Sequence, residues 1–292
     1  MNQSSSLRGY IKILNELGKV RISIPVAFTT FTGYVLSNGS VDSGFILPFL
    51  GIFFLACGAS ALNQVQESAT DLRMKRTALR PIPSGRITNS GALVISLVYF
   101  IIGSLLLILG PGWLTFWVGL ATFVWYNGIY TPLKKVSAFA VVPGSVVGAL
   151  PPIAGWVAGG GLLSDPKAWV IAVFFFIGQI PHFWLLLLKL GEQYTSADMP
   201  SLTTIFRTQQ IKRLTFIWIA ATAVAALLLP YYSITISIIG TGAIILFSIL
   251  LIIRFIPLLQ MKQPFNVGKS FVLINLYYLL IMLIMIADKL SS

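Results

Sequence analysis

Charge is scarce in this chain, and cysteine and histidine are nearly absent. Only 10% of the 292 residues are charged, 57% are hydrophobic, and cysteine and histidine occur once each. A soluble domain carries about 25% charged residues, so this composition excludes an ordinary soluble fold. The single cysteine, Cys57, excludes an intrachain disulfide and a cysteine-pair metal site.

Long apolar runs fill most of the sequence. A helix that crosses the bilayer core needs roughly 20 apolar residues, and nine stretches of the chain approach that length. They lie near residues 20–37, 44–64, 90–110, 112–130, 137–158, 168–189, 213–231, 233–256 and 270–288. The alternation typical of membrane strands is absent. We therefore expect an all-α polytopic membrane protein, with residues 1–292 forming one domain and nine transmembrane helices forming one bundle.

Basic residues outnumber acidic ones, and the formal net charge is +12. If the N-terminus lies in the cytoplasm, 18 of the 20 Lys and Arg residues fall on the inward side, and only Lys167 and Lys289 fall outside. Inward loops of membrane proteins carry such an excess. The excess of positive charge therefore indicates how the chain is oriented in the bilayer, and we expect no nucleic-acid partner. It predicts a bacterial cytoplasmic membrane protein, or its equivalent, with a cytoplasmic N-terminus and an outside C-terminus.

One inward stretch, LNQVQESATDLRMKRTALRPIPSGR at 62–86, combines acids with bases. Asn63, Glu67 and Asp71 are spaced by four, so on a helix they drift by only ~40° per step and share one face. Their oxygen atoms are hard ligands that suit Mg²⁺. The bases that follow can neutralise an anion, and the combination fits a diphosphate held through metal and cations. These bases are Arg73, Lys75, Arg76 and Arg80.

A solvated loop whose bases simply follow the topology is the alternative interpretation. It accounts for the Lys and Arg residues but not for the acids, which contribute little to orientation and are costly near a membrane. The functional interpretation is therefore favoured, and it predicts an active site on the cytoplasmic side.

Other polar groups are expected on the same side of the membrane. The loop after the sixth apolar run carries Glu192, Asp198 and Arg207, and YNGIYTPLKK places Tyr130 and Lys134 four residues apart. His182 lies within the sixth run, where an ionisable side chain is a functional candidate. The open alternative is a structural role, in which His182 bonds to a backbone carbonyl group at the kink near Pro181.

Four stretches, in order along nearly the whole chain, resemble one known family. The first is N-x-x-x-E-x-x-x-D-x-x-M-x-R-T-x-x-R-P, from Asn63 to Pro81. The others are YTPLKK at 130–135, VVGALPPIAGWVA at 146–158 and PHFW at 181–184. Together they resemble the UbiA-type intramembrane prenyltransferase superfamily, and more narrowly its protohaem IX farnesyltransferase (haem O synthase) branch.

The resemblance implies a helical bundle around a central cavity and an Mg²⁺-dependent transferase. Farnesyl diphosphate would bind with its diphosphate at the inward mouth, and a vinyl group of haem B would accept the farnesyl group to give haem O. The implied catalytic residues are Asn63, Glu67, Asp71, Glu192 and His182. Mg²⁺, expected as two ions, would be held by Asn63, Glu67, Asp71, Glu192 and Asp198. The diphosphate would be bound by Arg73, Lys75, Arg76, Arg80, Tyr130, Lys134 and Arg207.

The second acidic loop departs from the family pattern. Gln193 precedes Tyr194 where family members commonly carry Asp, so either Glu192 or Asp198 is expected to complete the metal site. Two other functions stay open: prenyl transfer to a quinone precursor or another lipid acceptor, and membrane transport. Partners in haem or oxidase assembly are also expected besides the lipid bilayer.

Overall fold

The computed structural model describes residues 7–195, 200–260 and 266–291, and for residues 189–195 it describes the backbone alone. Every regular element in these ranges is helical. The long helices are α1 (Leu7–Leu17), α2 (Val20–Asn38), α3 (Ile46–Asp71), α4 (Asn89–Leu109), α5 (Trp113–Val124), α8 (Val146–Ala158), α9 (Pro166–Thr195), α11 (Thr208–Tyr231), α12 (Ile238–Phe255) and α13 (Val267–Ser291). The short ones are η2 (Ser43–Phe45), the π-helix η3 (Trp125–Tyr130), α6 (Thr131–Leu133), α7 (Val141–Gly144), α10 (Leu202–Ile205) and η4 (Ile256–Leu259).

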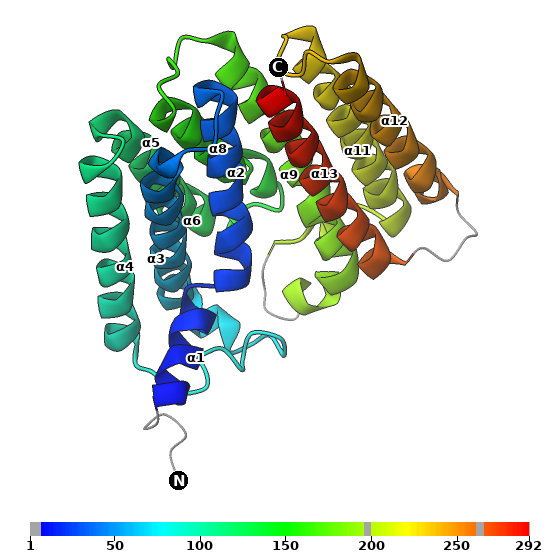
Figure 1. Ribbon diagram of the computed structural model, residues 1–292. Coiled ribbons are helices and arrows are strands. Elements are labelled where there is room, and N and C mark those ends of the chain that lie inside the picture. The colour runs from blue at the N-terminus through cyan, green and yellow to red at the C-terminus, as the bar shows by residue number, and fades with distance from the viewer. Residues whose placement is uncertain (1–6, 196–199, 261–265, 292) are drawn as a thin grey trace.

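The long helices from α2 onward form one closed bundle (Figure 1). Each packs against the next along the chain, and α13 returns to pack against α2. The largest hydrophobic core lies between α9, α11, α12 and α13, around Phe174, Ile219 and Phe255. Helix α1 and the segment that follows α3 lie together at one end of the bundle (Figure 1).

Helices α2 and α8 approach each other closely because glycine faces backbone at their crossing. A Cβ atom on Gly155 would collide with the carbonyl oxygen of Thr30, and one on Gly33 would collide with that of Pro152. Small residues allow such approach between membrane helices, where packing drives association. This contact fixes α8 against α2 and therefore fixes the position of the chain that leads into α8.

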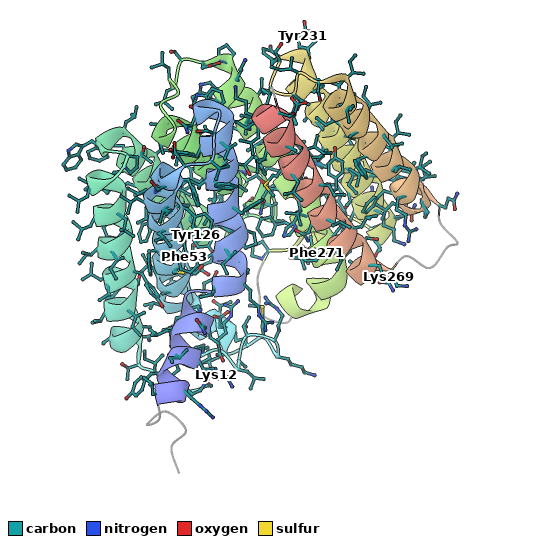
Figure 2. All side chains as sticks on the ribbon, viewed as in Figure 1. Lys12, Phe53, Tyr126, Tyr231, Lys269 and Phe271 are labelled. Carbon is teal, nitrogen blue, oxygen red and sulfur yellow. The ribbon has the colours of Figure 1, made fainter. Side chains whose placement is uncertain are left out.

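Seven helices within the described residues are long and apolar enough to cross a membrane. The predicted spans at 20–37 and 112–130 coincide with α2 and with α5 plus its π-helical continuation. These two are not among the seven helices that are long and apolar enough to cross a membrane. The all-helical membrane bundle is thus observed, whereas the number of nine spans stays a prediction. Figure 2 places Tyr231 at one end of the bundle, and Lys12 and Lys269 toward the other.

The helices do not end where the apolar runs end. Helix α3 continues to Asp71, seven residues beyond the apolar run near 44–64, so that Asn63, Glu67 and Asp71 lie on one helix, and its last turns bury these polar side chains. The predicted span at 137–158 is divided into α7 and α8, with Ser145 between them.

A buried acid with a structural role lies at the end of the bundle opposite to α1. Asp288 of α13 is 4% exposed and accepts hydrogen bonds from the backbone N–H groups of Ile236 (2.6 Å) and Ser237 (3.0 Å) and from the Ser237 hydroxyl. The Ser237 hydroxyl in turn accepts from the N–H of Gly240 at 2.9 Å and caps α12. Asp288 therefore ties the start of α12 to the end of α13.

Candidate active site

The three oxygen-bearing residues of the predicted stripe lie at the C-terminal end of α3. Asn63, Glu67 and Asp71 are all buried, with exposed fractions of 1%, 8% and 1%. A buried carboxylate is costly unless it is paired and hydrogen-bonded. Asn63 contacts the segment before α2, Glu67 the segment after η3, and Asp71 the segment after α3. Helix α3 is therefore the element that all these segments contact.

Asp71 is bound by the segment that immediately follows it. The chain turns back after α3, and Arg80 donates to both carboxylate oxygens of Asp71 at 2.8 and 2.6 Å. The Thr77 hydroxyl donates to the backbone carbonyl of Asp71 at 2.9 Å and holds the turn. The sequence motif R-T-x-x-R therefore folds so that its last arginine covers the last acid of the stripe.

Glu67 is bound by the segment that follows the fourth apolar run. The Nζ atom of Lys134 lies 2.5 Å from Glu67 Oε1 and 5.2 Å from the centre of the Tyr130 ring. Burial lowers the pKa of Lys134 from its ordinary value, although the neighbouring Glu67 carboxylate opposes this effect. Tyr130 and Lys134 thus lie side by side, and their binding of a diphosphate stays a prediction.

Asn63 contacts Lys19, a residue that was not predicted from the sequence. Its amide nitrogen donates to the Thr131 hydroxyl at 3.0 Å, and Lys19 Nζ donates to its Oδ1 at 3.3 Å. Lys19 stands between α1 and α2 with a φ of 44°, in the left-handed region. Burial, followed by the positive charges of Arg80 and Lys134, lowers the pKa of Lys19 to about 7.

A π-helix positions the Tyr130–Lys134 segment. Residues Trp125–Tyr130 are wound in π conformation, a form often found at functional sites. The Thr131 hydroxyl donates to the carbonyl of Tyr126 at 2.9 Å. Lys135 Nζ donates to the carbonyl of Gln66 at 2.9 Å, and Gln66 Nε2 donates to the carbonyl of Asn127 at 3.1 Å. The last two bonds attach the segment to α3 at Gln66, next to Glu67.

We call Lys19, Asn63, Glu67, Asp71, Arg80 and Lys134 the α3 cluster. It combines two carboxylates and an amide with three cationic side chains from three separate segments. Such a group can bind a divalent cation through oxygen and an anion through nitrogen, because the carboxylates and the cations can each exchange their present partners for a ligand of opposite charge.

The other predicted phosphate-binding residues lie outside these ion pairs. Arg73, Lys75 and Arg76 are exposed in the turn after α3, and Arg207 is exposed at the start of α11. In the described part of the chain, Lys75, Arg76 and Arg207 form no salt bridge with the acids of the α3 cluster. Their predicted roles stay predictions.

The second acidic loop cannot be placed beside the first. Helix α9 runs through Glu192, but the side chain of Glu192 and the whole of Asp198 lie outside the described residues. Within the described residues, no three Asp, Glu, His or Cys side chains come together as a metal-binding group. Which of the two acids completes the metal site stays a prediction.

His182 faces a different neighbour from the α3 cluster. Its ring centre lies 4.5 Å from that of Phe271 on α13, and Asn275 of the same helix is its hydrogen-bond partner. The next residue, Phe183, has its ring centre 6.2 Å from that of Tyr130. His182 is therefore directed toward α13, whereas its neighbour Phe183 contacts Tyr130, and the catalytic role of His182 stays a prediction.

Comparison with known proteins identifies the family. The model of the UbiA prenyltransferase family matches residues 26–281. The chain belongs to the UbiA prenyltransferase family. This family membership agrees with the resemblance of the four motifs, and it covers the segments that supply all members of the α3 cluster except Lys19.

Curated UbiA-family relatives are similar over most of their length. The chain is 39% identical to the protoheme IX farnesyltransferase of Nitratidesulfovibrio vulgaris over 212 residues, which are 73% of this chain and 74% of that protein. It is 34% identical to the protoheme IX farnesyltransferase of Oleidesulfovibrio alaskensis over 222 residues, 76% of this chain and 78% of the relative.

A solved UbiA-family structure shares the fold. The UbiA homologue from Archaeoglobus fulgidus bound to GPP and Mg²⁺ superimposes with a TM-score of 0.68 at 13% identity, covering 96% of this chain and 100% of that one. The present chain is thus an integral membrane protein with the architecture of the UbiA family.

Proposed function

We propose that this protein transfers a farnesyl group from farnesyl diphosphate to a vinyl group of haem B, which gives haem O. The curated relatives at 39% and 34% identity are protoheme IX farnesyltransferases. The structural observation that carries the proposal is the α3 cluster, because a membrane bundle has little reason to bury two acids with three cations except to bind a charged ligand.

The cationic members of the cluster are suited to the diphosphate. Arg80 and Lys134 already contact carboxylate oxygens at 2.6 and 2.5 Å, and phosphate oxygens offer them the same kind of acceptor. Lys19 belongs to the same cluster because its Nζ atom donates a hydrogen bond to Asn63. Three cations from three segments can surround the diphosphate and stabilise the negative charge that develops on it as it leaves.

The oxygen atoms of the cluster fit Mg²⁺. Asn63 offers an amide oxygen, and Glu67 and Asp71 offer carboxylate oxygens, which are the hard donors that this ion prefers. They are few enough to leave room for phosphate and water. The A. fulgidus homologue binds GPP with Mg²⁺. When bound, the ion supplies charge neutralisation on the phosphate oxygens. We propose two ions, with Glu192 or Asp198 completing the site.

The transfer needs little covalent chemistry from the protein. The allylic C–O bond breaks, and its electron pair leaves with the diphosphate. The terminal vinyl carbon of haem B attacks C1 of the farnesyl cation, and water then adds to the haem side chain and releases a proton. The chain contributes by holding the leaving group among Lys19, Arg80 and Lys134, and by keeping water from the cation until the acceptor is in place.

The proposal places the site on the cytoplasmic side of the membrane. It includes nine spans, with α2 and the α5–η3 helix crossing in addition to the seven apolar helices, a cytoplasmic N-terminus, an outside C-terminus and a central cavity. The clustering of basic residues in the segments around Lys19, Arg80 and Lys134 supports this orientation.

Mass spectrometry of the reaction products tests the function. The purified chain, reconstituted in liposomes with farnesyl diphosphate, haem B and Mg²⁺, is expected to form haem O, and a chelator is expected to stop the reaction. A parallel reaction with a quinone precursor as acceptor separates the alternatives. Prenylated quinone precursor without haem O would refute haem as the acceptor, while leaving diphosphate binding by the α3 cluster intact.

A further inference from the structure

Helix α1 presents three different faces. Ile13 and Leu17 are buried and pack against α3 and α4. A second face, which we call the apolar stripe, is hydrophobic but exposed and follows the spacing of one helix face. Its members are Leu7, Tyr10, Ile11 and Leu14, which are between 36% and 76% exposed. The third face carries the exposed bases Arg8 and Lys12, four residues apart. An exposed apolar stripe beside a basic face is typical of a helix at a membrane surface.

The packing of α1 places it at the level where a membrane helix begins. Its buried face packs against Ala92, in the first turn of α4, and α4 is one of the seven helices that can cross a membrane. Farther along α4, the Tyr99 hydroxyl lies 3.5 Å from the carbonyl oxygen of Leu14. Val98, next to Tyr99, is exposed and on a membrane-spanning helix faces lipid. The apolar stripe of α1 therefore adjoins a surface that lipid covers.

The two bases of α1 are available to an external anion. In the described part of the chain, Arg8 and Lys12 form no salt bridge. Glu16 stands four residues after Lys12, a spacing that allows an ion pair on a helix. Its carboxylate instead pairs with Arg86, of the segment after α3, at 2.6 Å. The one acid of α1 is therefore already paired, and both bases can bind another partner.

The C-terminal end of α1 is firmly attached to the bundle. Gln64 Nε2 of α3 donates to the carbonyl groups of Glu16 at 2.9 Å and Leu17 at 3.1 Å. The Ser23 hydroxyl of α2 donates to the carbonyl group of Gly18 at 2.8 Å. These bonds satisfy carbonyl groups that a helix end leaves without an intrahelical partner. The apolar stripe and the basic face are therefore held in a fixed orientation, which lowers the entropic cost of binding.

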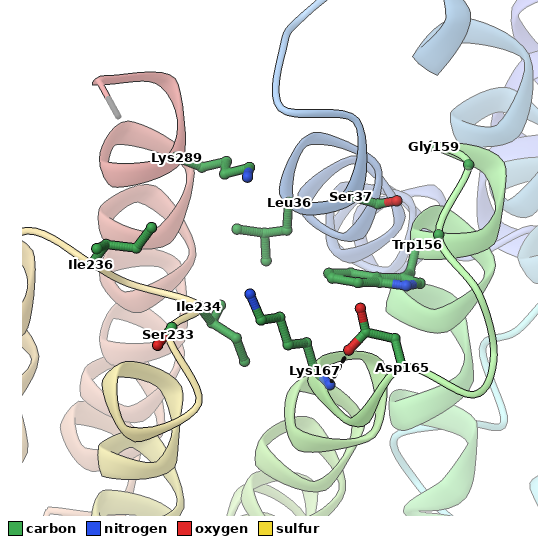
Figure 3. Close-up of a pocket in the computed structure, with 12 residues that line it drawn as sticks. Leu36, Ser37, Trp156, Gly159, Asp165, Lys167, Ser233, Ile234, Ile236 and Lys289 are labelled. Atoms are coloured by element: carbon green, nitrogen blue, oxygen red, sulfur yellow. Dashed lines mark hydrogen bonds between the residues drawn. The ribbon is translucent and has the colours of Figure 1, made fainter.

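The charges at the opposite end of the bundle are of both signs. Figure 3 shows Lys289 of α13 and Lys167 at the start of α9, whose side chains extend toward the same space, and Asp165 close to Lys167. The carboxylates of Asp42 and Asp288 lie at this end as well. Carboxylates repel an anionic surface, so the end that carries the unpaired bases of α1 is the one that such a surface favours.

We propose that α1 binds anionic phospholipids of the leaflet at its end of the bundle. Arg8 and Lys12 bind the phosphate groups, and the apolar stripe lies at the boundary between the headgroups and the acyl chains. This surface is separate from the α3 cluster, and lipid binding to it does not depend on prenyl transfer.

Photo-crosslinking of the full-length chain tests this surface. The purified chain is reconstituted in liposomes of phosphatidylglycerol and phosphatidylcholine in equal amounts, with the photoactivatable group on one of the two lipids in each of two arms. Mass spectrometry of the peptides is expected to find α1 labelled preferentially by phosphatidylglycerol. Each of Arg8→Gln and Lys12→Gln is expected to lower this preference about fivefold, the contribution of one base near an anionic surface, and the double variant to abolish it. Arg8→Lys and Lys12→Arg, which keep the charge, are expected to keep the preference.

Lys269→Gln is the matched control, because Lys269 is an exposed lysine toward the same end of the bundle but on α13 (Figure 2). It is expected to leave the preference at α1 unchanged, and thermal unfolding in detergent reports whether each variant is folded. Equal labelling of α1 by both lipids in the wild-type chain, or no labelling of α1 by either, would overturn the proposal. So would an equal loss of preference in Lys269→Gln or an unchanged preference in the double variant. Crosslinks between the α1 helices of two chains in place of lipid would identify a second copy as the occupant and overturn the proposal as well.

Discussion

Buried acids at the two ends of the bundle are held in opposite ways. Asp71 and Glu67 are bound by the side-chain cations Arg80 and Lys134. Asp288 is bound by two backbone N–H groups and one hydroxyl at the start of α12. A cation on a flexible side chain can move to another anion, whereas a backbone N–H group cannot leave its helix. The first kind of acid can therefore bind a ligand, and the second holds the fold.

The same chemical change at each end gives the sharpest test of this difference. Asp71→Asn removes one negative charge and keeps the side-chain shape. Because the ligand for the divalent cation is weakened and the leaving group is less well stabilised, we expect haem O formation to fall by about 100-fold or more. Product formation in liposomes measures the loss. Wild-type turnover by a folded Asp71→Asn protein would remove Asp71 from the site.

Asp288→Asn is the counterpart at the other end. An amide offers one acceptor oxygen in place of two and directs an N–H group at backbone donors, so we expect the free energy of unfolding to fall by about 2 kcal/mol. Thermal unfolding in detergent measures this change, and turnover per folded molecule is expected to stay close to wild type. A selective loss of turnover without loss of stability would contradict the structural role of Asp288.

Lys134→Gln tests the cationic side of the α3 cluster. One charge-assisted contact to the diphosphate is lost, so we expect KM for farnesyl diphosphate to rise about tenfold. Lys134→Arg keeps the charge and is expected to recover part of the affinity, although the two side chains differ in shape. Steady-state kinetics with varied farnesyl diphosphate distinguishes the two. An unchanged KM in the glutamine variant would exclude contact between Lys134 and the substrate.

Lys75→Gln is expected to have the smallest effect. Lys75 is exposed and outside the salt bridges of the cluster, and charges in high-dielectric surroundings contribute little. We therefore expect a change in KM within about threefold, measured beside Lys134→Gln under the same ionic strength. A tenfold or larger effect would show that the turn after α3 closes over the substrate.

The sequence predicts the helical architecture well, because apolar length and composition alone determine which segments enter a bilayer. It also predicts the shared face of Asn63, Glu67 and Asp71 from their spacing, and all three are buried at the end of α3. Local periodicity is sufficient for both, since neither depends on contacts between distant segments.

The residues that the sequence analysis missed depend on long-range contacts. Lys19 reaches Asn63 across 44 positions, and Asp288 reaches Ile236 and Ser237 across more than 50. Nothing in the residues near Lys19 or Asp288 indicates these partners. The left-handed position itself is occupied by Lys19, and not by the glycine or asparagine that usually indicates this backbone conformation. The π conformation at Trp125–Tyr130 has no sequence signal either.

That π-helix has a consequence for how the chain can vary in length. A π-turn contains one more residue than an α-turn between its hydrogen-bonded groups, so a one-residue deletion within Trp125–Tyr130 could close into a regular α-helix. A deletion that removes this extra residue would leave the helical segments on both sides in their present register, whereas a deletion within α5, outside the π-turn, would turn every later residue by about 100° around the helix axis. In that second case Thr131 and Lys134 would point away from α3 although the helix itself was intact. The π-turn is therefore the place in this helix where the chain can lose one residue and still keep Lys134 beside Glu67.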